Sequence, residues 1–317
     1  SYPFYNLFGN LAAAVSGVVI HKLSFLNLNF SFLASNSSLY CCYFVNIMLC
    51  ILLGVIATFI FQFLSSKRKL LESRIEKQKK KTSEQPRYSF YQSFLMVIKS
   101  RYLLCLLVLS ISYNAIFTLF DTLWSQSVKD YFGVKELEIV RFLADIQITK
   151  GVLSTLLAFC VPFFIKKLGW KRSALITPIF LLVSGFAFFP LYFFQGSETL
   201  KAFFYDIFGL DLIWILAYCG GVQNALSRGS KYSIYDTTKE MAFIPLPLEQ
   251  KRKGKAIIDG VASRMGKASG AILLMVLLPV CVSLNATVPY LALACCLVLF
   301  AWIYSVTYLD KHIKKQK

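Results

Sequence analysis

The stretch YLLCLLVLSISYNAIFTLF, residues 102–120, decides the fold class because it carries no charged side chain over a length that can cross a bilayer. A hydrocarbon core about 30 Å thick needs roughly 20 mostly apolar residues in one helix. Runs of similar character recur along the whole chain. We predict eight membrane-spanning helices, at residues 4–20, 39–64, 102–120, 143–165, 174–194, 212–226, 270–284 and 288–308.

The composition of the whole chain agrees with this prediction. Hydrophobic residues make up 57% of the 317 positions, charged residues make up only 16%, and the mean hydropathy is +0.60. This is too apolar for a water-soluble domain of the same size. Strands of a membrane barrel would alternate apolar and polar residues, and the run 181–194 does not. The predicted fold class is therefore all-α, a polytopic bundle of membrane helices.

The formal charge of +18 alone would suggest nucleic-acid binding, but the positions of the charges indicate a membrane orientation instead. The stretches that would face one side of the membrane hold only Lys22, Lys129, Lys135, Arg141 and Lys201. Far more Lys and Arg lie on the other side, at 67–101, 166–172, 228–267 and 311–317. Because basic loops stay in the cytoplasm, these four stretches are predicted to be cytoplasmic. We expect a lipid bilayer, and no nucleic acid, as the surroundings of this chain.

Three regions follow from the spans and charges. Residues 1–64 would form the end of an N-terminal membrane half with two helices. Residues 65–101 contain the run KRKLLESRIEKQKKKTSEQPR and would form a basic cytoplasmic linker. Residues 102–317 would form a C-terminal membrane half of six helices with a cytoplasmic tail. Since the chain opens on Ser1, we expect it to be part of a longer protein.

No pattern in the sequence indicates catalysis or a metal site. The nine cysteines lie in or beside apolar runs without CxxC spacing, which is typical of small buried hydrophobic residues. HExxH, GxSxG and GxxxxGK[ST] motifs are absent from the sequence, and the two histidines lie at presumed membrane boundaries. We therefore expect no enzyme activity, no catalytic residue, no metal and no cofactor.

Two ionisable residues in or at the edge of the spans are the first candidates for function. Such a residue costs roughly 2.5 to 3.5 kcal/mol on insertion scales, so it is rare without a purpose. Asp121 would be either a surface carboxylate beside Trp124 or a carboxylate that gates or couples transport, with Asn114 on about the same helix face. Lys150 would either pair with a carboxylate or snorkel, or it would contact a phosphate.

The stretch from Ser227 to Ala271 concentrates further candidates beside a span. Lysine and arginine suit a polyphosphate, because each neutralises part of its charge as the phosphate leaves water. Gly254, Gly266 and Gly270 would permit close approach of the backbone. With Asp121 and Lys150, the candidate binding and transport residues are Lys231, Asp236, Lys239, Glu240, Lys255, Asp259, Arg264 and Lys267.

This stretch also resembles a known family, the non-mitochondrial ATP/ADP translocases of plastids and intracellular parasites. The family carries a block similar to KYSLFDPTKEMAYIPL, then KGKAAID and a GK-small-small motif. This chain has KYSIYDTTKEMAFIPL at 231–246, KGKAIID at 253–259 and GKASGA at 266–271. Weaker similarity covers FYNLFGNLAAAVSG, SYNAIFTLFDTLW and KKLGWKRSALITP, at 4–17, 112–124 and 166–178.

The resemblance implies a major-facilitator-like fold of two six-helix halves around a cavity that opens alternately to either side. The eight spans would be the last eight of twelve. It also implies ATP:ADP antiport, with both nucleotides as substrates, in the cell membrane of an intracellular parasite or in a plastid envelope. The family's acidic and basic block residues would correspond to the candidates above, and its acidic residue before the Trp to Asp121.

The chain departs from the family at three positions. Asp121 stands where Glu is usual, Thr237 where Pro is usual, and Lys150 where a small or polar residue is usual. The added charge of Lys150 raises the possibility of altered exchange specificity. A proton-coupled importer of other nucleotides, a membrane enzyme for phosphorylated lipids and a degenerate scaffold are the alternatives. The preferred nucleotide and the oligomeric state do not follow from the sequence.

Overall fold

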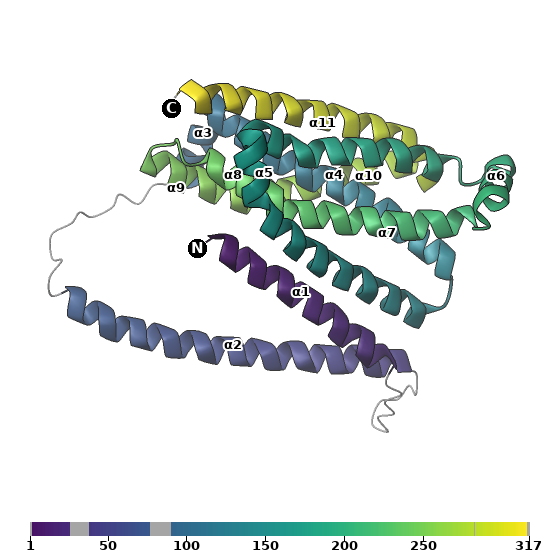
Figure 1. Cartoon of the computed structure of the whole chain (residues 1–317), viewed down its shortest axis with the longest axis horizontal. Coiled ribbons are helices and arrows are strands. Elements are labelled where there is room, and N and C mark those ends of the chain that lie inside the picture. The colour runs from purple at the N-terminus through teal and green to yellow at the C-terminus, as the bar shows by residue number, and fades with distance from the viewer. Residues whose placement is uncertain (1, 26–37, 77–89, 282, 316–317) are drawn as a thin grey trace. The chain divides into compact units, whose positions relative to one another are not determined.

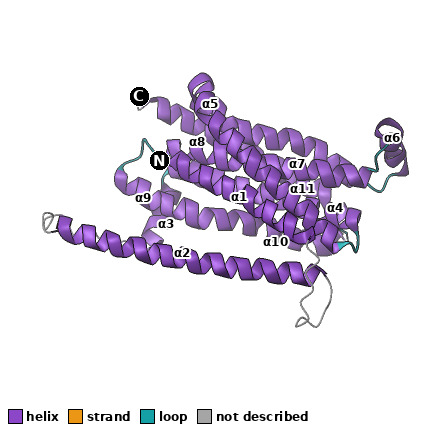
Figure 2. Ribbon diagram, turned by 60° about the horizontal axis from the view of Figure 1, so that its bottom comes forward, coloured by secondary structure: helices purple, strands orange, loops and turns teal. Residues whose placement is uncertain are grey.

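The computed structural model describes residues 2–25, 38–76, 90–281 and 283–315, and every regular element within them is helical (Figure 2). The prediction of an all-α fold is confirmed. The helices are α1 (Tyr2–Phe25), α2 (Ser38–Glu76), α3 (Phe90–Lys99), α4 (Arg101–Phe132), α5 (Glu136–Phe193), α6 (Glu198–Phe208), α7 (Leu212–Ser230), η1 (Lys231–Tyr235), α8 (Asp236–Ala242), α9 (Leu248–Ile257), η2 (Ile258–Ala262), α10 (Ser263–Cys281) and α11 (Leu284–Lys315). Of these, η1 and η2 are short π-helical turns.

The chain forms two compact units. The larger unit comprises Ser1–Val18 and Phe90–Lys317, and the smaller unit comprises Val19–Ser89. Within the smaller unit, the segment Tyr43–Ser66 of α2 has a mean hydropathy of 2.7 and buries none of its most apolar stretch, as expected for a helix surrounded by lipid. Residues 77–89 of the predicted linker lie outside the described residues. The predicted boundaries at 64 and 101 stay a prediction.

Several helices are long and apolar enough to cross a membrane, so the protein is an integral membrane protein. Among the described residues there are five, or six if the bent pair Glu198–Phe208 and Leu212–Ala242 is one span. One of them, α5, contains both predicted spans 143–165 and 174–194. Gly169 separates these two spans with φ 76° and ψ 172°, a non-helical conformation in which a side chain would be strained. The predicted number of eight spans stays a prediction.

Helix α4 is the centre of the larger unit. It packs against α5, α7, α10 and α11, and Figure 1 shows these long helices lying lengthwise beside one another. The most apolar part of α4 is 78% buried, compared with 33% in α11. A span covered by protein on all sides can carry polar groups that lipid would not tolerate. This explains why Ser110, Ser112 and Asn114 lie inside it.

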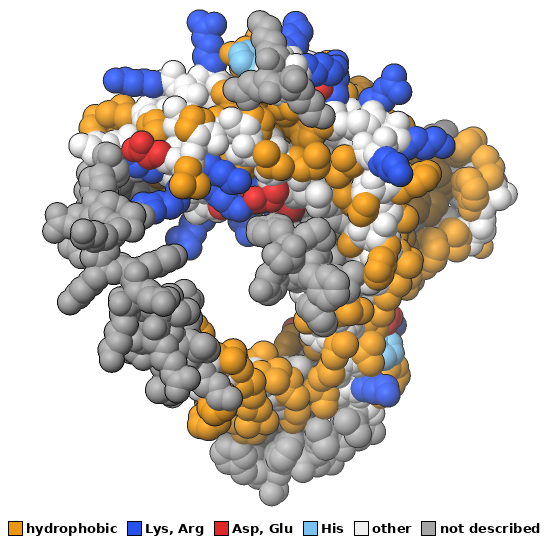
Figure 3. Space-filling model, turned by 60° about the vertical axis from the view of Figure 1, so that its left-hand side comes forward, with side chains coloured by type: hydrophobic (Ala, Val, Ile, Leu, Met, Phe, Trp, Pro, Cys, Tyr) orange, Lys and Arg blue, Asp and Glu red, His pale blue; other side chains and the backbone are white. Residues whose placement is uncertain are grey.

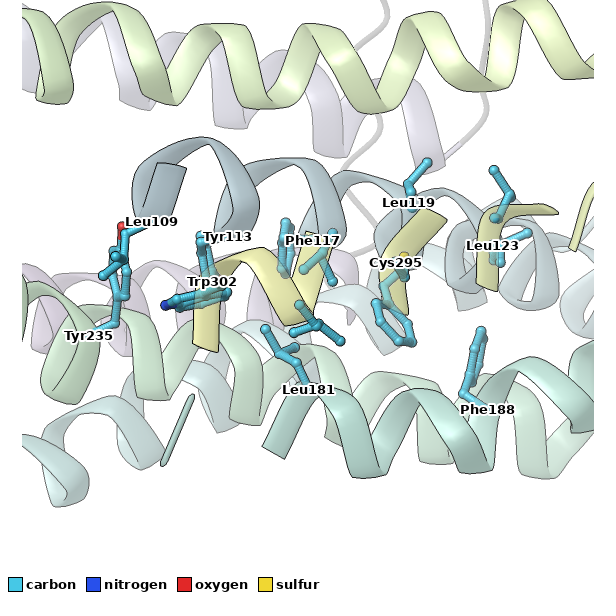
Figure 4. Close-up of a cluster of buried hydrophobic side chains, with 14 of the residues drawn as sticks. Leu109, Tyr113, Phe117, Leu119, Leu123, Leu181, Phe188, Tyr235, Cys295 and Trp302 are labelled. Atoms are coloured by element: carbon cyan, nitrogen blue, oxygen red, sulfur yellow. The ribbon is translucent and has the colours of Figure 1, made fainter. Parts of the chain in front are cut away.

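An aromatic cluster joins α4 to α11 and η1. Trp302 is fully buried, and its ring lies edge-on to Tyr113 at 6.2 Å and to Tyr235 at 5.6 Å between ring centres (Figure 4). Tyr113 and Tyr235 stack on each other at 5.3 Å. Edge-to-face and offset-stacked rings contribute about 0.5–1.5 kcal/mol per pair beyond the area they bury. The cluster therefore holds the π-helical turn η1 against the central helix.

Glycines set the contact between α10 and α4. A Cβ atom on Gly266 would lie 2.5 Å from the carbonyl oxygen of Ile111, and one on Gly270 would lie 3.0 Å from that of Ala115. Small residues at this spacing let two membrane helices approach closely. On α9, a Cβ on Gly254 would lie 2.8 Å from the side chain of Leu103. All three glycines thus approach α4, which accounts for them without a bound ligand.

The two ends of the larger unit differ in charge. Figure 1 shows α3, α8, α9 and the C-terminus at one end and α6 at the other. Figure 3 looks toward the first end and shows Lys and Arg side chains gathered on it. Within the larger unit, α8, α9 and the end of α11, which belong to stretches that the charge pattern predicts to be cytoplasmic, thus lie at one end, in agreement with that orientation.

Candidate functional site

Three helices of the larger unit enclose a cavity of about 320 Å³. Lys150, which lines the cavity, is near the middle of the helical segment from Glu136 to the break at Gly169. The cavity therefore lies beside the middle of that segment. One wall of the cavity is formed by α5. The other walls are formed by α1 and by the region where α7 continues into η1. The lining residues are Gly9, Asn10, Ala13, Gln147, Lys150, Ser154, Arg228 and Tyr232.

Contact between α1 and α5 brings Asn10 to this cavity. A Cβ on Gly151 would lie 2.4 Å from the backbone nitrogen of Ala14, and one on Gly17 would lie 2.7 Å from Ile148. The residue numbers run in opposite directions along the two helices, so the helices are antiparallel. Asn10, one turn before Ala14, therefore lies toward Ser154 at the cavity wall. Gly17 and Gly151 thus allow α1 to approach α5 closely enough to form one wall of the cavity.

Two cations project into the cavity, Lys150 from α5 and Arg228 from α7. The ammonium of Lys150 lies 5.6 Å from the centre of the Trp124 ring, and the guanidinium of Arg228 lies 4.3 Å from that of Phe117. Aromatic faces attract cations in this way. Within the described part of the chain, no carboxylate lies within ion-pair distance of either group. Neither group is therefore neutralised by an ion pair with a described carboxylate, and both line the cavity where an anion could approach.

Asp121 supplies one negative charge near this pair. The amide of Asn224 on α7 donates a hydrogen bond of 2.6 Å to its carboxylate. Lys150 interacts electrostatically with Asp121, which attracts it, and with Arg228, which repels it. Two positive charges and one negative charge leave a net positive site within the bundle. Asn114, on the predicted polar stripe, instead faces α10, where its amide oxygen accepts from Ser263 at 3.4 Å.

Several buried polar atoms around the cavity have no hydrogen-bond partner among the described residues. They include the amide nitrogen of Asn10, which is only 5% exposed, and Nε of Arg228. Buried donors without a partner are rare, because leaving one unsatisfied costs about 1–3 kcal/mol. Both are donors, so a ligand with acceptor oxygens would satisfy them.

The acidic and basic residues of the 231–259 block form a separate network. Lys239 pairs with Asp259 at 2.8 Å and with Asp236 at 3.6 Å, and Lys255 pairs with Glu240 at 2.6 Å. These pairs tie α8 to α9 and η2. The Lys239 side chain is only 11% exposed, so its charge is balanced within the protein. Helices α8 and α9, which carry most of this network, lie at the same end of the larger unit as α3 (Figure 1).

The remaining predicted site residues lie elsewhere. Lys231 places its ammonium 4.7 Å from the Tyr232 ring and 5.5 Å from the Tyr113 ring. Arg264 and Lys267 are exposed on α10, whose glycines face α4, and they do not line the cavity. The predicted residues thus divide between the cavity, the ion-pair network and an exposed helix face. Their assignment to one substrate site stays a prediction.

The sequence-based list of site residues did not contain Asn10, Asn224 or Tyr232. It also left out Arg228, although Arg228 belongs to the basic stretch 227–271 that the sequence indicates for a polyphosphate. For Arg228 the reason is the predicted span 212–226, which ends before it. In the structure the helical path continues from Leu212 through η1 to Ala242, so Arg228 lies within it. A signal was present in the sequence. Arg228 directly follows the segment QNALS at 223–227 and precedes Gly229 and Ser230, so it stands at the end of a predicted span. Asn10 had no such signal, because only the contact between α1 and α5 places it.

A larger cavity, of about 360 Å³, lies between α4, α5 and α11 but is lined by apolar side chains such as Phe120, Phe189 and Leu299. It offers no charged group to a polar substrate. Among the residues that the structure describes, no three His, Cys, Asp or Glu side chains cluster as metal ligands would. The cationic cavity is therefore the better candidate for a binding site.

The fold and the cavity define an integral, multi-pass membrane protein with a cationic site inside its helix bundle. The sequence profile described as TLC ATP/ADP transporter matches residues 1–313, and the chain belongs to that family. It is 37% identical to ADP,ATP carrier protein 2 of Chlamydia pneumoniae over 78% of this chain and 45% of the relative. It is 28% identical to ADP,ATP carrier protein 1 of Rickettsia prowazekii over 97% of this chain and 61% of the relative.

The similarity extends to other carriers of the same name. ADP,ATP carrier protein 1 of Chlamydia trachomatis is 37% identical over 73% of this chain and 43% of its own length. The chain spans about half of the length of the relatives it matches. No solved structure matches the chain. The sequence-based assignment to the family is confirmed.

Proposed function

We propose that the protein exchanges ATP for ADP across a membrane by alternating access. The observation that carries this proposal is the pair of cations, Lys150 and Arg228, which line a membrane cavity without an ion-pair partner among the described residues, with Asp121 as a more distant counter-charge of Lys150. The names of the relatives, which are ADP,ATP carrier proteins, agree with a nucleotide as the anion. They favour exchange over proton-coupled import of other nucleotides.

Charge balance gives a physical reason for binding. Cations in a medium of low dielectric constant are costly unless a partner neutralises them. The phosphate chain of ATP or ADP would supply that partner, with Arg228 forming paired hydrogen bonds and Lys150 acting as a point charge. The free donors of Asn10 and Arg228 would be satisfied in the same step. The protein itself needs no covalent step and no cofactor, and the nucleotides are its substrates.

Asp121 would set the balance between the empty and the loaded carrier. With no nucleotide bound, its carboxylate is the counter-charge of Lys150 and is held in place by Asn224. A bound phosphate chain would compete with it for the two cations. Substrate binding would thereby shift the equilibrium between states open to either side, since a ligand favours the state it binds better. The empty carrier would reorient slowly and the loaded carrier quickly.

The membrane that we propose is the cell membrane of an intracellular parasite. The relatives in Chlamydia and Rickettsia support this setting over a plastid envelope. We also propose that the protein is a carrier without enzyme activity, because its relatives are named as carriers.

Counterflow tests the function directly. Lipid vesicles that contain the protein and are preloaded with ADP should accumulate labelled ATP, whereas vesicles without internal ADP should not. Vesicles without protein provide the control. ATP uptake that does not depend on internal ADP would rule out strict exchange and favour proton-coupled import. If no labelled nucleoside phosphate accumulates under any gradient, nucleotide transport itself is excluded.

A further inference from the structure

A second cavity, of about 290 Å³, lies farther along α5, toward the break at Gly169, and shares Tyr232 with the first. It lies between the later turns of the first α5 segment and the region of η1 and α8. One cation, Lys166, lines it, together with hydroxyl groups of Ser233 and Thr237. The full lining is Ala158, Val161, Pro162, Ile165, Lys166, Tyr232, Ser233 and Thr237.

The two cavities lie along one stripe of α5. Lys150 and Ser154 line the first, and Ala158, Val161 and Ile165 line the second, at the spacing of successive helical turns. At 1.5 Å per residue, Lys166 lies roughly 24 Å along the helix from Lys150. Lys150 is thus in the middle of the span, and Lys166 is at its end, next to the basic turn around Gly169. The stripe thus runs from the membrane interior to the cytoplasmic surface.

One residue, Tyr232, lines both cavities and so belongs to a wall that they share; it is 37% exposed. It belongs to the π-helical turn η1, a kind of irregularity that occurs frequently at functional sites and can mark a hinge. The ammonium of Lys231 lies 4.7 Å from its ring centre. A phosphate that passes Tyr232 would therefore meet Arg228 and Lys150 in the first cavity and Lys166 in the second.

We propose that the Lys166 cavity is a second binding station for the substrate's phosphates and that Tyr232 is the gate between the two stations. This inference rests on the proposed nucleotide exchange. Cations at both stations, Lys150 and Arg228 in the first and Lys166 in the second, would let a polyanion leave one site without losing all of its charge compensation. The aromatic ring between the stations prevents a continuous path through the carrier when no substrate is bound.

Neighbouring lysines provide a matched test of the second station. Lys166 lines the cavity, whereas Lys167 places its ammonium 5.5 Å from the Phe163 ring and does not. In ATP:ADP exchange by vesicles, Lys166→Gln should raise the half-saturating nucleotide concentration on the cytoplasmic side about fivefold, as for one exposed ion pair. Lys167→Gln removes the same charge and should leave it unchanged. Equal values for both variants would refute the station, as expected if Lys166 only meets lipid headgroups.

Leakage tests the gate. In vesicles with no external nucleotide, Tyr232→Ala should raise the efflux of preloaded nucleotide about tenfold. The reason is that the path between the cavities then stays open even when no substrate is bound. Tyr232→Phe keeps the ring and should remain as tight as wild type. Tyr304→Ala removes an exposed tyrosine of α11 outside both cavities and is the control for general damage. A tight Tyr232→Ala variant, or an equally leaky Tyr304→Ala variant, would refute the gate.

Thiol labelling gives a measurement that does not require nucleotide transport. A cysteine placed at Ser154 in the first cavity should react faster with a charged thiol reagent from the Lys166 side when Tyr232→Ala is also present. An unchanged rate would count against the gate even if the exchange assay fails. If wild-type protein exchanges no nucleotide while labelling accelerates, the proposed function fails and the gate between the cavities stands.

Discussion

At the scale of single residues, the decisive feature is whether a basic side chain has a carboxylate within ion-pair distance. Lys239 and Lys255 have carboxylates of their own block within 2.8 Å and 2.6 Å. Lys150 and Arg228 instead face aromatic rings and a cavity. Although all four are basic residues in or beside spans, only the second pair keeps charge available for a substrate.

Arg228 should therefore contribute strongly to nucleotide binding. Arg228→Gln should weaken the binding of labelled ATP to the protein by roughly 10- to 100-fold, because it removes charge-assisted hydrogen bonds worth about 1.5–3 kcal/mol. Arg252→Gln makes the same change on α9, outside the cavity, and should leave binding within about twofold of wild type. Equal binding by wild type and Arg228→Gln would remove the arginine from the site.

At the scale of elements, the 231–259 block links helices. Its ion pairs tie α8 to α9 and η2, while Tyr102 donates a 2.6 Å hydrogen bond to the carbonyl of Ala242 and Trp170 a 2.9 Å bond to that of Thr238. Aromatic side chains of α4 and α5 thus hold the end of α8. The block therefore contributes to the shape of the basic end of the bundle, whatever further contact it makes with substrate.

A charge exchange separates this structural role from phosphate binding. Lys255→Glu places two like charges together and should lower nucleotide uptake at least about tenfold, with membrane insertion largely unchanged. Adding Glu240→Lys restores an opposite pair and should recover most of the uptake. A double variant as inactive as the single one would support Lys255 as a phosphate ligand. The control is Lys253→Glu, which disrupts the pair of Lys253 with the exposed Glu249 and should have little effect.

At the scale of the whole molecule, the distribution of charge predicts the orientation in the membrane. The larger unit carries α9 at its basic end and α6 at the opposite end (Figure 1). Because the basic end should be cytoplasmic, we predict that α9 lies on the cytoplasmic side of the membrane and α6 on the opposite side. The proposed stations lie between them, with the Lys166 station nearer to the cytoplasm.

Membrane-impermeant thiol reagents test this orientation in cells. A cysteine at Glu249 in α9 should be labelled only after the cell is opened, and a cysteine at Lys201 in α6 should be labelled from outside. The signal is measured above that of the native cysteines. Labelling of the Glu249→Cys variant in intact cells would reverse the orientation and place the Lys166 station outside.

The sequence by itself determined the all-helical membrane fold, the family and the charged end of the bundle. Apolar length, charge asymmetry and the 231–271 motifs are local properties, so they can be read along one chain. It also pointed to Asp121 and Lys150, because an ionisable group within a span costs free energy wherever that span packs.

Only the tertiary structure decided which charges remain open. Lys239, Lys255 and Arg228 look alike in the sequence, yet ion pairs between α8, α9 and η2 balance the first two. The third instead lines a cavity to which α1, α5 and α7 contribute residues. The gate position of Tyr232 likewise depends on two cavities formed by residues far apart in the chain. The physical reason is that charge compensation depends on distances in space, and helix packing sets those distances.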